Sequence, residues 1–144
     1  MSTLNISNIR AGLKNVITNL VTSTTISVVY DYYEPSVSGY PAVVFDITDN
    51  ADSFLTTTEN LIKITFSAYV LVEIYQDGIS DATDLLDGVT DDLIAELRKT
   101  SNMTLGGTVD WISPALGPRS QVETPNGMAF SQQLNIAVNL ASSI

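Results

Sequence analysis

The stretch LIKITFSAYVLVEIY, residues 61–75, alternates apolar and polar side chains over most of its length. Side chains of a β-strand point to the two faces of a sheet in turn, so this pattern predicts one long strand with one buried face. The apolar set is Ile62, Ile64, Phe66, Ala68, Val70, Val72 and Ile74. At about 3.3 Å per residue such a strand approaches 50 Å, so we expect one end to project or to bend at a bulge.

Two runs rich in β-branched and aromatic residues precede this strand, at residues 26–33 and 40–48. The sequence EPSVSG between them has the composition of a turn, which predicts an antiparallel pair. Residues 49–59 then separate the second strand from the third. Because eleven residues are many for a hairpin connection, we expect a functional or mobile loop there, one that becomes ordered on docking.

Two segments have helical periodicity. Residues 6–21 repeat apolar side chains every three or four positions, which predicts an amphipathic helix. A second helix is predicted to begin at Ser80 or Asp81 and to end at Arg98 and Lys99, whose charge suits a helix C-terminus. Its apolar stripe consists of Ala82, Leu85, Leu86, Val89, Leu93 and Leu97.

The remainder reads as a short strand at 109–112, a loop at 113–119, a hairpin tip at 125–127 and a last alternating strand at 128–140. The prediction is therefore a single α+β domain over residues 1–144, in the order α-β-β-β-α-β-β. Its sheet is mainly antiparallel, has five to six strands, and carries the two amphipathic helices on one face.

The composition excludes several function classes. With no cysteine and no histidine there is no disulfide framework, no Ser-His-Asp triad and no imidazole or thiolate metal ligand. The net charge of -10 excludes a basic footprint for nucleic acid. Residues 1–9 lack the pattern of a signal peptide, and no run approaches the roughly 20 apolar residues of a membrane span. We therefore expect a cytoplasmic protein without a membrane segment.

The low charge of the surface favours assembly. Charged residues make up 15% of the chain, against about 25% in an average protein. The 15 serines and 16 threonines take their place. A neutral hydroxyl-bearing surface buries easily against another protein, because no charge has to be desolvated.

No constellation of catalytic or metal-ligating residues stands out. A calcium loop counted from Asp77 fails, since its sixth and twelfth positions hold Ala82 and Gly88. Asp46, Asp49 and Asp52 have a spacing that suits a hard cation, but nothing else supports a site. The sixteen carboxylates single out no acid–base pair. We expect no cofactor and no metal.

The order of segments resembles that of the tail terminator (tail completion) proteins of long-tailed bacteriophages. The resemblance rests on the leading amphipathic helix and on the entry to the second strand, GYPAVV at 39–44. It continues with LVEIY at 71–75, with LLD at 85–87 in an acidic helix, and with the closing strand 130–140.

This resemblance implies a structural virion protein, not an enzyme, that is made in the host cytoplasm and ends at the head-proximal end of the tail. Members of the family form a six-fold ring on the tail tube, stop its polymerisation and offer the surface for head joining. The implied partners are further copies of the chain in a hexamer, the tail tube protein and the head-tail connector proteins. DNA passes through without specific binding, which the acidic balance favours.

Other functions stay open. A head-side neck or connector protein, or a tail-tube subunit, has the same kind of ring but a different partner. A small carboxylate-only enzyme or binding domain requires a pocket with converging groups and no ring.

Three sets of residues are candidates for these contacts. The basic edge of the first helix is predicted to meet an acidic helix face of a neighbour, unless both simply face water: Arg10 and Lys14 against Asp84, Asp87 and Asp91. The predicted loop is expected to dock on the tube or an adjacent subunit through its charged and apolar residues: Asp49, Asp52, Phe54, Leu55 and Glu59. The alternative is that Phe54 and Leu55 tuck under the sheet edge. Asp31 and Asp46 are expected to line the channel together with the carboxylates of that loop.

Overall fold

The computed structural model describes residues 5–23, 25–34, 37–54, 59–74, 78–125 and 127–143, with backbone alone for 49–54, 59–60 and 142–143. The element order is α1 (Ile6–Thr22), β1 (Val28–Tyr30), β2 (Ala42–Phe54), β3 (Glu59–Ile74), α2 (Ile79–Leu97), two short 3-10 helices η1 (Thr100–Asn102) and η2 (Leu105–Gly107), β4 (Trp111–Thr124) and β5 (Gly127–Ser143). The predicted α+β fold and its order of elements are confirmed.

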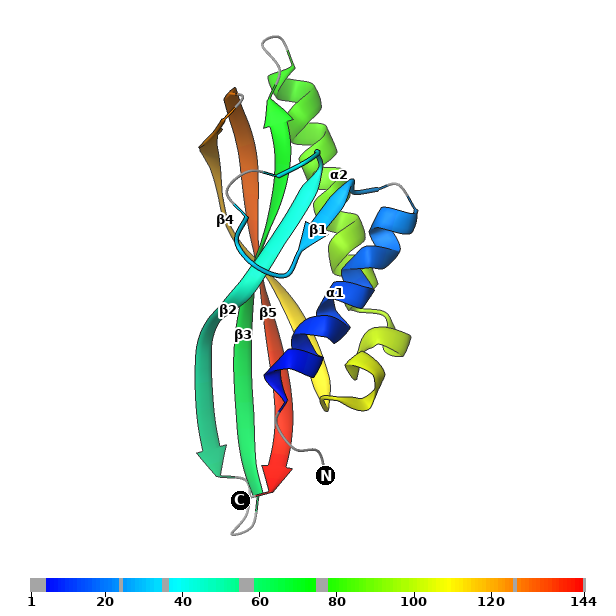
Figure 1. Ribbon diagram of the computed structural model, residues 1–144, viewed down its shortest axis with the longest axis vertical. Coiled ribbons are helices and arrows are strands. Elements are labelled where there is room, and N and C mark those ends of the chain that lie inside the picture. Colours follow the sequence, from blue (N-terminus) through cyan, green and yellow to red (C-terminus); the bar gives the residue numbers. More distant parts are fainter. Residues whose placement is uncertain are drawn as a thin grey trace.

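One five-stranded sheet, in the order β1-β2-β3-β5-β4, forms the long axis of the molecule (Figure 1). All neighbouring strands are antiparallel except β1 and β2. Both helices cover the same face, and β2, β3 and β5 extend past them at the lower end (Figure 1). The lower projection, which we call the three-stranded arm, consists of residues 48–54 of β2, 59–65 of β3 and 137–143 of β5. At its base β4 adds a fourth strand, because residues 111–113 pair with 137–139 of β5.

The core lies between the helices and the sheet. Ile64, Phe66, Ala68, Val70 and Val72 are buried, which confirms the alternation predicted for β3. The apolar stripes of both helices pack on them, including the fully buried Leu13 and Leu93 of α1 and α2. Leu85, predicted in the stripe of α2, is 48% exposed, because the buried side of the helix runs through Leu86 and Val89 instead. Phe66 also meets Phe45 of β2 edge to face, with ring centroids 6.0 Å apart.

The predicted antiparallel pairing of the first two strands is wrong. β1 has three residues and runs parallel to β2, with Val28 beside Ala42 and Tyr30 beside Val44. Parallel strands require a crossover in place of a tight turn. The connection contacts the sheet face opposite the helices, where the Tyr33 hydroxyl donates to the Ser67 carbonyl at 3.3 Å. Alternating hydropathy is the same for both strand directions, so the pattern did not distinguish them.

The predicted loop at 113–119 is also wrong, because β4 runs through it. Pro114 pairs with Ile136, and the register shifts between Leu116 and Arg119 at a bulge that contains Gly117 and Pro118. β4 is an edge strand, where a proline without an N–H is tolerated because one side of the strand makes no ladder. The hairpin tip is confirmed, with Thr124 opposite Gly127, while Asn126 lies outside the described residues.

The predicted loop at 49–59 is mostly strand. β2 continues to Phe54 and β3 begins at Glu59, so residues 55–58 alone lie between them, and these lie outside the described residues. A register shift between Ile47 and Asp49 lets pairing with β3 resume. The ladder satisfies the backbone of this polar segment, which outweighs the turn preference of its aspartates and asparagine.

The start of α2 differs from the prediction by a few residues. The N-cap is Gly78, which has no side-chain to contribute a hydrogen bond, and neither Ser80 nor Asp81 caps the helix. Asp81 still lies in the first turn, where a negative charge is favourable.

Candidate functional site

The sheet face opposite the helices carries a row of polar side chains that hydrogen-bond across three strands. The Ser67 hydroxyl of β3 lies 3.0 Å from the Thr48 hydroxyl of β2 and donates to Asn135 Oδ1 of β5 at 3.1 Å. Gln133 of β5 donates to the same Asn135 oxygen at 3.0 Å. These hydrogen bonds hold the four neutral side chains in place, so the centre of the face is preorganised.

Aromatic residues border this row. Tyr33, from the connection between β1 and β2, packs edge to face on Tyr69 with ring centroids 5.7 Å apart. Burial raises the pKa of the Tyr33 phenol above its usual 10.0, with smaller contributions from Tyr69 and Asp46. The phenol therefore stays protonated and acts as the donor to Ser67. Trp111 of β4 is exposed, and its register partner on β5 is Asn139.

On β3, β5 and β4 the centre of this face lacks charge among the residues whose side chains are described. On β2, Asp46 is the register partner of Ser67 and is charged, but it is paired with Arg10. Going along β3, the positions on this side between Lys63 and Glu73 are Thr65, Ser67, Tyr69 and Leu71. Neighbouring positions on β5 and β4 are Gln133, Asn135, Ala137, Ser113 and Ala115. We call this set the neutral sheet face.

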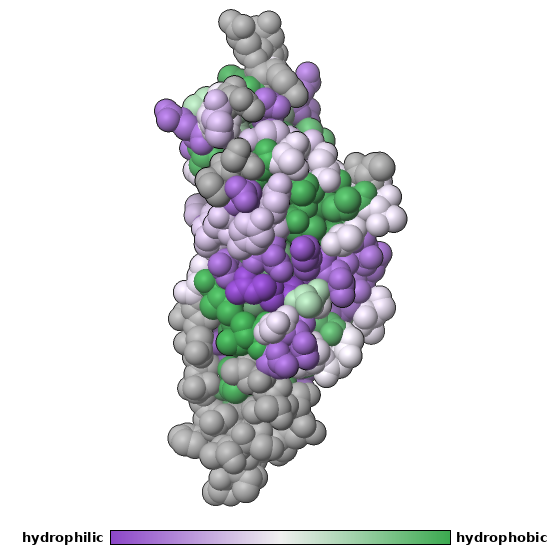
Figure 2. Space-filling model, viewed as in Figure 1, coloured by the Kyte–Doolittle hydropathy of each residue, from purple (hydrophilic) through white to green (hydrophobic). Residues whose placement is uncertain are grey.

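Arg10 lies where β2 parts from β1. Its guanidinium forms an ion pair with Asp46 at 2.8 Å, donates to the Asp31 carbonyl oxygen and stacks 5.9 Å from the Phe66 ring centroid. A predicted interface residue and two predicted channel residues are thus in contact within one chain. Hydrophilic residues form a band across the middle of the side shown in Figure 2. Arg10 and Asp46 satisfy each other, so neither presents a bare charge to a partner.

The exposed side of α2 is acidic. Asp81, Asp84, Asp87, Asp91 and Asp92 are all exposed. Asp87 pairs with Arg119 of β4 at 2.7 Å, whereas no ion pair of Asp84, Asp91 or Lys14 is found in the described part of the chain. The predicted contact between Lys14 and Asp84 or Asp91 of a neighbour stays a prediction, while Arg10 and Asp87 already have partners in their own chain.

Glu96 is a buried carboxylate that the sequence analysis missed. Asn19 of α1 donates to it at 3.0 Å, Asn102 of η1 at 3.2 Å, and Lys99 forms an ion pair at 2.7 Å. The hydrogen bond from Lys99 lowers the pKa of Glu96 below its ordinary 4.5, and Asn19, Asn102 and the Lys99 charge act in the same direction against the effect of burial. A glutamate inside the apolar stripe between Leu93 and Leu97 is the signal that could have identified it.

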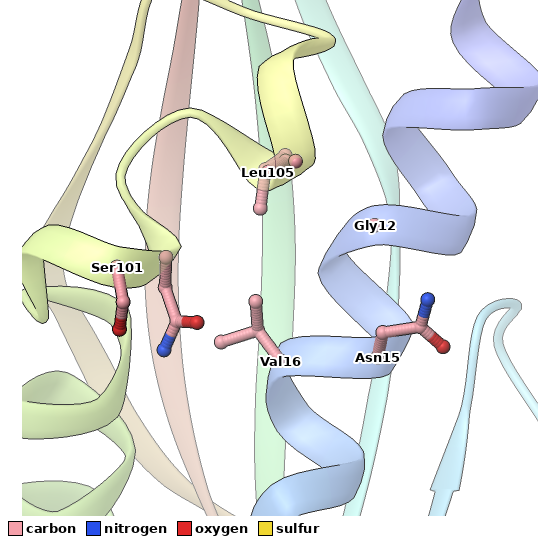
Figure 3. A pocket seen from close by; sticks show the side chains of 7 residues that line it. Gly12, Asn15, Val16, Ser101 and Leu105 are labelled. Atoms are coloured by element: carbon pink, nitrogen blue, oxygen red, sulfur yellow. The ribbon is translucent and has the colours of Figure 1, made fainter.

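Hollows lined by described residues lie beside the helices. One of about 250 Å³ separates α1 from the loop that carries the 3-10 helices, and is lined by Gly12, Asn15, Val16, Ser101, Asn102, Leu105 and Gly106. Figure 3 shows Val16 and Leu105 on facing sides of it. Another, of about 430 Å³, opens between α1 and α2 beside Glu96, Lys99 and Asp92. The lining of the first contains no acid, base or charged group, which is the chemistry of a packing groove.

Comparisons with known proteins do not assign the chain to a family. No family model matches the chain, and no curated protein is recognisably similar to it. Among the described helices, none is long and apolar enough to cross a membrane. In the same residues, no group of three carboxylates is arranged to hold a metal ion.

The structure places the predicted docking residues on the three-stranded arm. Asp49, Asp52 and Phe54 belong to β2 and Glu59 opens β3, while Leu55 lies outside the described residues. Whether Phe54 and Leu55 act as anchors stays a prediction. What changes is the form of the element, which is a strand pair with an open edge and not an eleven-residue loop.

Proposed function

We propose that this protein is a structural virion subunit that assembles into a ring at the end of a phage tail tube, ends the growth of the tube and offers a surface for head joining. The observation that carries the proposal is the neutral sheet face. It is preorganised by the bonds among Thr48, Ser67, Asn135 and Gln133. Its positions on β3, β5 and β4 between Lys63 and Glu73 are neutral, and the charge of Asp46 on β2 is paired with Arg10.

The exposed side of α1 supports the same conclusion. Its exposed residues are all uncharged: Ile6, Ser7, Asn8, Ala11, Asn15, Thr18, Asn19 and Thr22. Two different neutral surfaces on one subunit suit heterologous contacts, which close into a ring when the rotation between neighbours allows it. Exposed acidic residues on α2 would then face solvent or the channel, where like charge keeps DNA from adhering.

The buried carboxylate does not favour an enzyme. A general acid that works near neutral pH has a raised pKa, as burial in an apolar site produces. Glu96 has a lowered pKa and contacts groups from α1 and η1. Its arrangement is structural: Lys99 pairs with it locally, and the hydrogen bonds from Asn19 and Asn102 link α2 to α1 and η1.

The oligomeric state tests the proposal. Native mass spectrometry of the purified chain at high micromolar concentration, alone and with tail tubes, is expected to show a closed homo-oligomer. Electron microscopy should place the ring at the head-proximal end of the tail. A monomer under both conditions contradicts the proposal.

A matched pair of variants then locates the interface. Ala115→Lys adds one charge to the neutral sheet face, and Ser80→Lys adds the same charge to the exposed side of α2. We expect the first to weaken assembly about tenfold or more, the equivalent of 1.4 kcal/mol, and the second to leave it unchanged. Equal effects would show that the sheet face is not the interface.

A further inference from the structure

We propose that residues 48–54 of β2 form an open sheet edge that binds an extended, basic segment of another protein by strand addition. The proposal rests on the proposed function for the source of this segment, a neighbouring virion protein. It replaces the predicted docking loop with a backbone-mediated contact on the three-stranded arm.

An exposed edge strand offers unpaired N–H and C=O groups, and proteins usually protect such edges. Most of the sheet margin here is protected. β1 is three residues long, and β4 carries Pro114, Pro118 and a bulge. At the end of β5, the Asp110 amide donates to the Asn139 carbonyl at 3.0 Å and its carboxylate accepts from the Ala141 amide at 2.7 Å.

The edge of β2 differs below Asp46. β1 pairs with residues 42–44 of β2 alone. Beyond the end of β1, the Arg10 side chain of α1 lies beside β2 and forms its ion pair with Asp46. After the register shift at Thr48, residues Asp49 to Phe54 pair with β3 on one side, and the described part of the chain supplies no strand for the other. This stretch contains no proline and lies on the margin away from both helices (Figure 1). Within the described residues, a strand can therefore approach it without meeting β1 or either helix.

Charge identifies the occupant. The open stretch carries Asp49 and Asp52 in seven residues, on a chain of net charge -10. A second copy of this chain fits poorly, because its strands carry two basic residues, Lys63 and Arg119. Lys63 lies in β3, which is paired on both sides, and Arg119 is engaged by Asp87. An added strand with lysine or arginine matches the edge, since main-chain bonds supply affinity and side chains supply specificity in this mode of binding.

Peptide binding tests the inference. The probe is a capped nine-residue peptide in which lysine alternates with valine and threonine. One control peptide has glutamate in place of lysine, and another is N-methylated at alternate residues so that it cannot complete a ladder. We expect the lysine peptide to bind at least about tenfold more tightly than either control. It should also slow amide exchange within residues 48–54.

Two double variants with the same net charge test whether the lysine peptide binds at the edge of β2 or is attracted by the negative charge of the whole chain. The double change Asp49→Lys and Asp52→Lys should abolish binding of the lysine peptide, whereas Asp84→Lys and Asp91→Lys on α2 should leave it within about twofold. Thermal unfolding checks that both variants fold. Equal loss in the two variants, or tight binding of the N-methylated peptide, overturns the inference.

The same samples distinguish this inference from the proposed ring. Mass spectrometry without peptide should give the same oligomer for the β2 variant as for the parent chain. If the β2 variant instead loses self-association, and the parent already protects residues 48–54 in its oligomer, the occupant is a second copy and the inference is wrong. A monomeric parent chain that still binds the lysine peptide contradicts the ring and leaves the edge supported.

Discussion

The two helices bury similar stripes against the same sheet face, but their exposed sides are unlike. α1 buries Ile9, Leu13, Val16, Ile17 and Leu20 and exposes uncharged residues, whereas α2 buries a comparable set and exposes five aspartates. Packing needs the buried stripe alone, so it does not require either kind of exposed surface. The exposed sides of the two helices are therefore not constrained by packing, and their difference in charge can reflect function.

The buried stripes should be equally important. Leu13→Ala in α1 and Leu93→Ala in α2 each remove a fully buried side chain, and each should lower the free energy of unfolding by about 2–5 kcal/mol. Urea denaturation followed by circular dichroism measures both. A loss in one variant below about 1 kcal/mol would mean that this helix is an appendage to a core built by the other.

The contact between the helices should show in the pH dependence of stability. Glu96→Gln should cost about 1–3 kcal/mol at neutral pH, because it removes charge-assisted bonds from Asn19, Asn102 and Lys99. The folded pKa of Glu96 is lowered, so its contribution is present above the unfolded pKa and is lost as pH falls through the folded pKa, below 4.5.

Urea titrations of the parent chain and of Glu96→Gln from neutral to acidic pH measure this contribution. The gap between the two free energies should close below pH 4.5. Glu123→Gln on the exposed margin of β4 is the control and should leave stability unchanged. A gap that stays constant with pH would mean that the substitution acts through packing and not through charge.

The two mid-helix glycines should respond in opposite ways. Gly88 of α2 has open space where a Cβ would lie, so Gly88→Ala should stabilise by about 0.5–1 kcal/mol through helix propensity. At Gly12 of α1 a Cβ would lie 3.0 Å from the Leu105 Cβ. Gly12→Ala should therefore forfeit that gain or destabilise, as measured by thermal melts. Equal stabilisation would show that η2 moves aside freely.

The smallest effect concerns the exposed charge of α2. Asp87→Asn breaks an ion pair in which both side chains are substantially exposed, so the free energy of unfolding should change by less than about 0.5 kcal/mol. Chemical denaturation with and without added salt measures it. A larger loss would show that the acidic side of α2 contributes to folding, and the contrast with α1 would then have a structural origin.

Much of this fold was predictable from local pattern. The alternation in β3 and the helical repeats of α1 and α2 reflect which side of each element is buried. Burial of apolar surface is the dominant favourable term in folding, so these patterns predicted the elements. Turn chemistry located the tip between β4 and β5. The secondary structure predicted for the candidate docking residues was wrong, because Asp49, Asp52, Phe54 and Glu59 belong to strands, and their role in docking stays a prediction.

Non-local geometry decided the rest. The direction of β1, the passage of β4 through Pro114 and Pro118, and the extension of β2 to Phe54 depend on which strand lies alongside, and one strand's pattern does not record its neighbour. The partners of Arg10 and Glu96 lie up to 36 and 77 residues away in the chain. Sequence alone determined most of the apolar core and that the chain has few charged residues, but not the burial of Glu96 or the exposure of Leu85. The tertiary structure decided which charges neutralise one another and which sheet edge stays open, because both depend on contacts between segments that are distant in the chain.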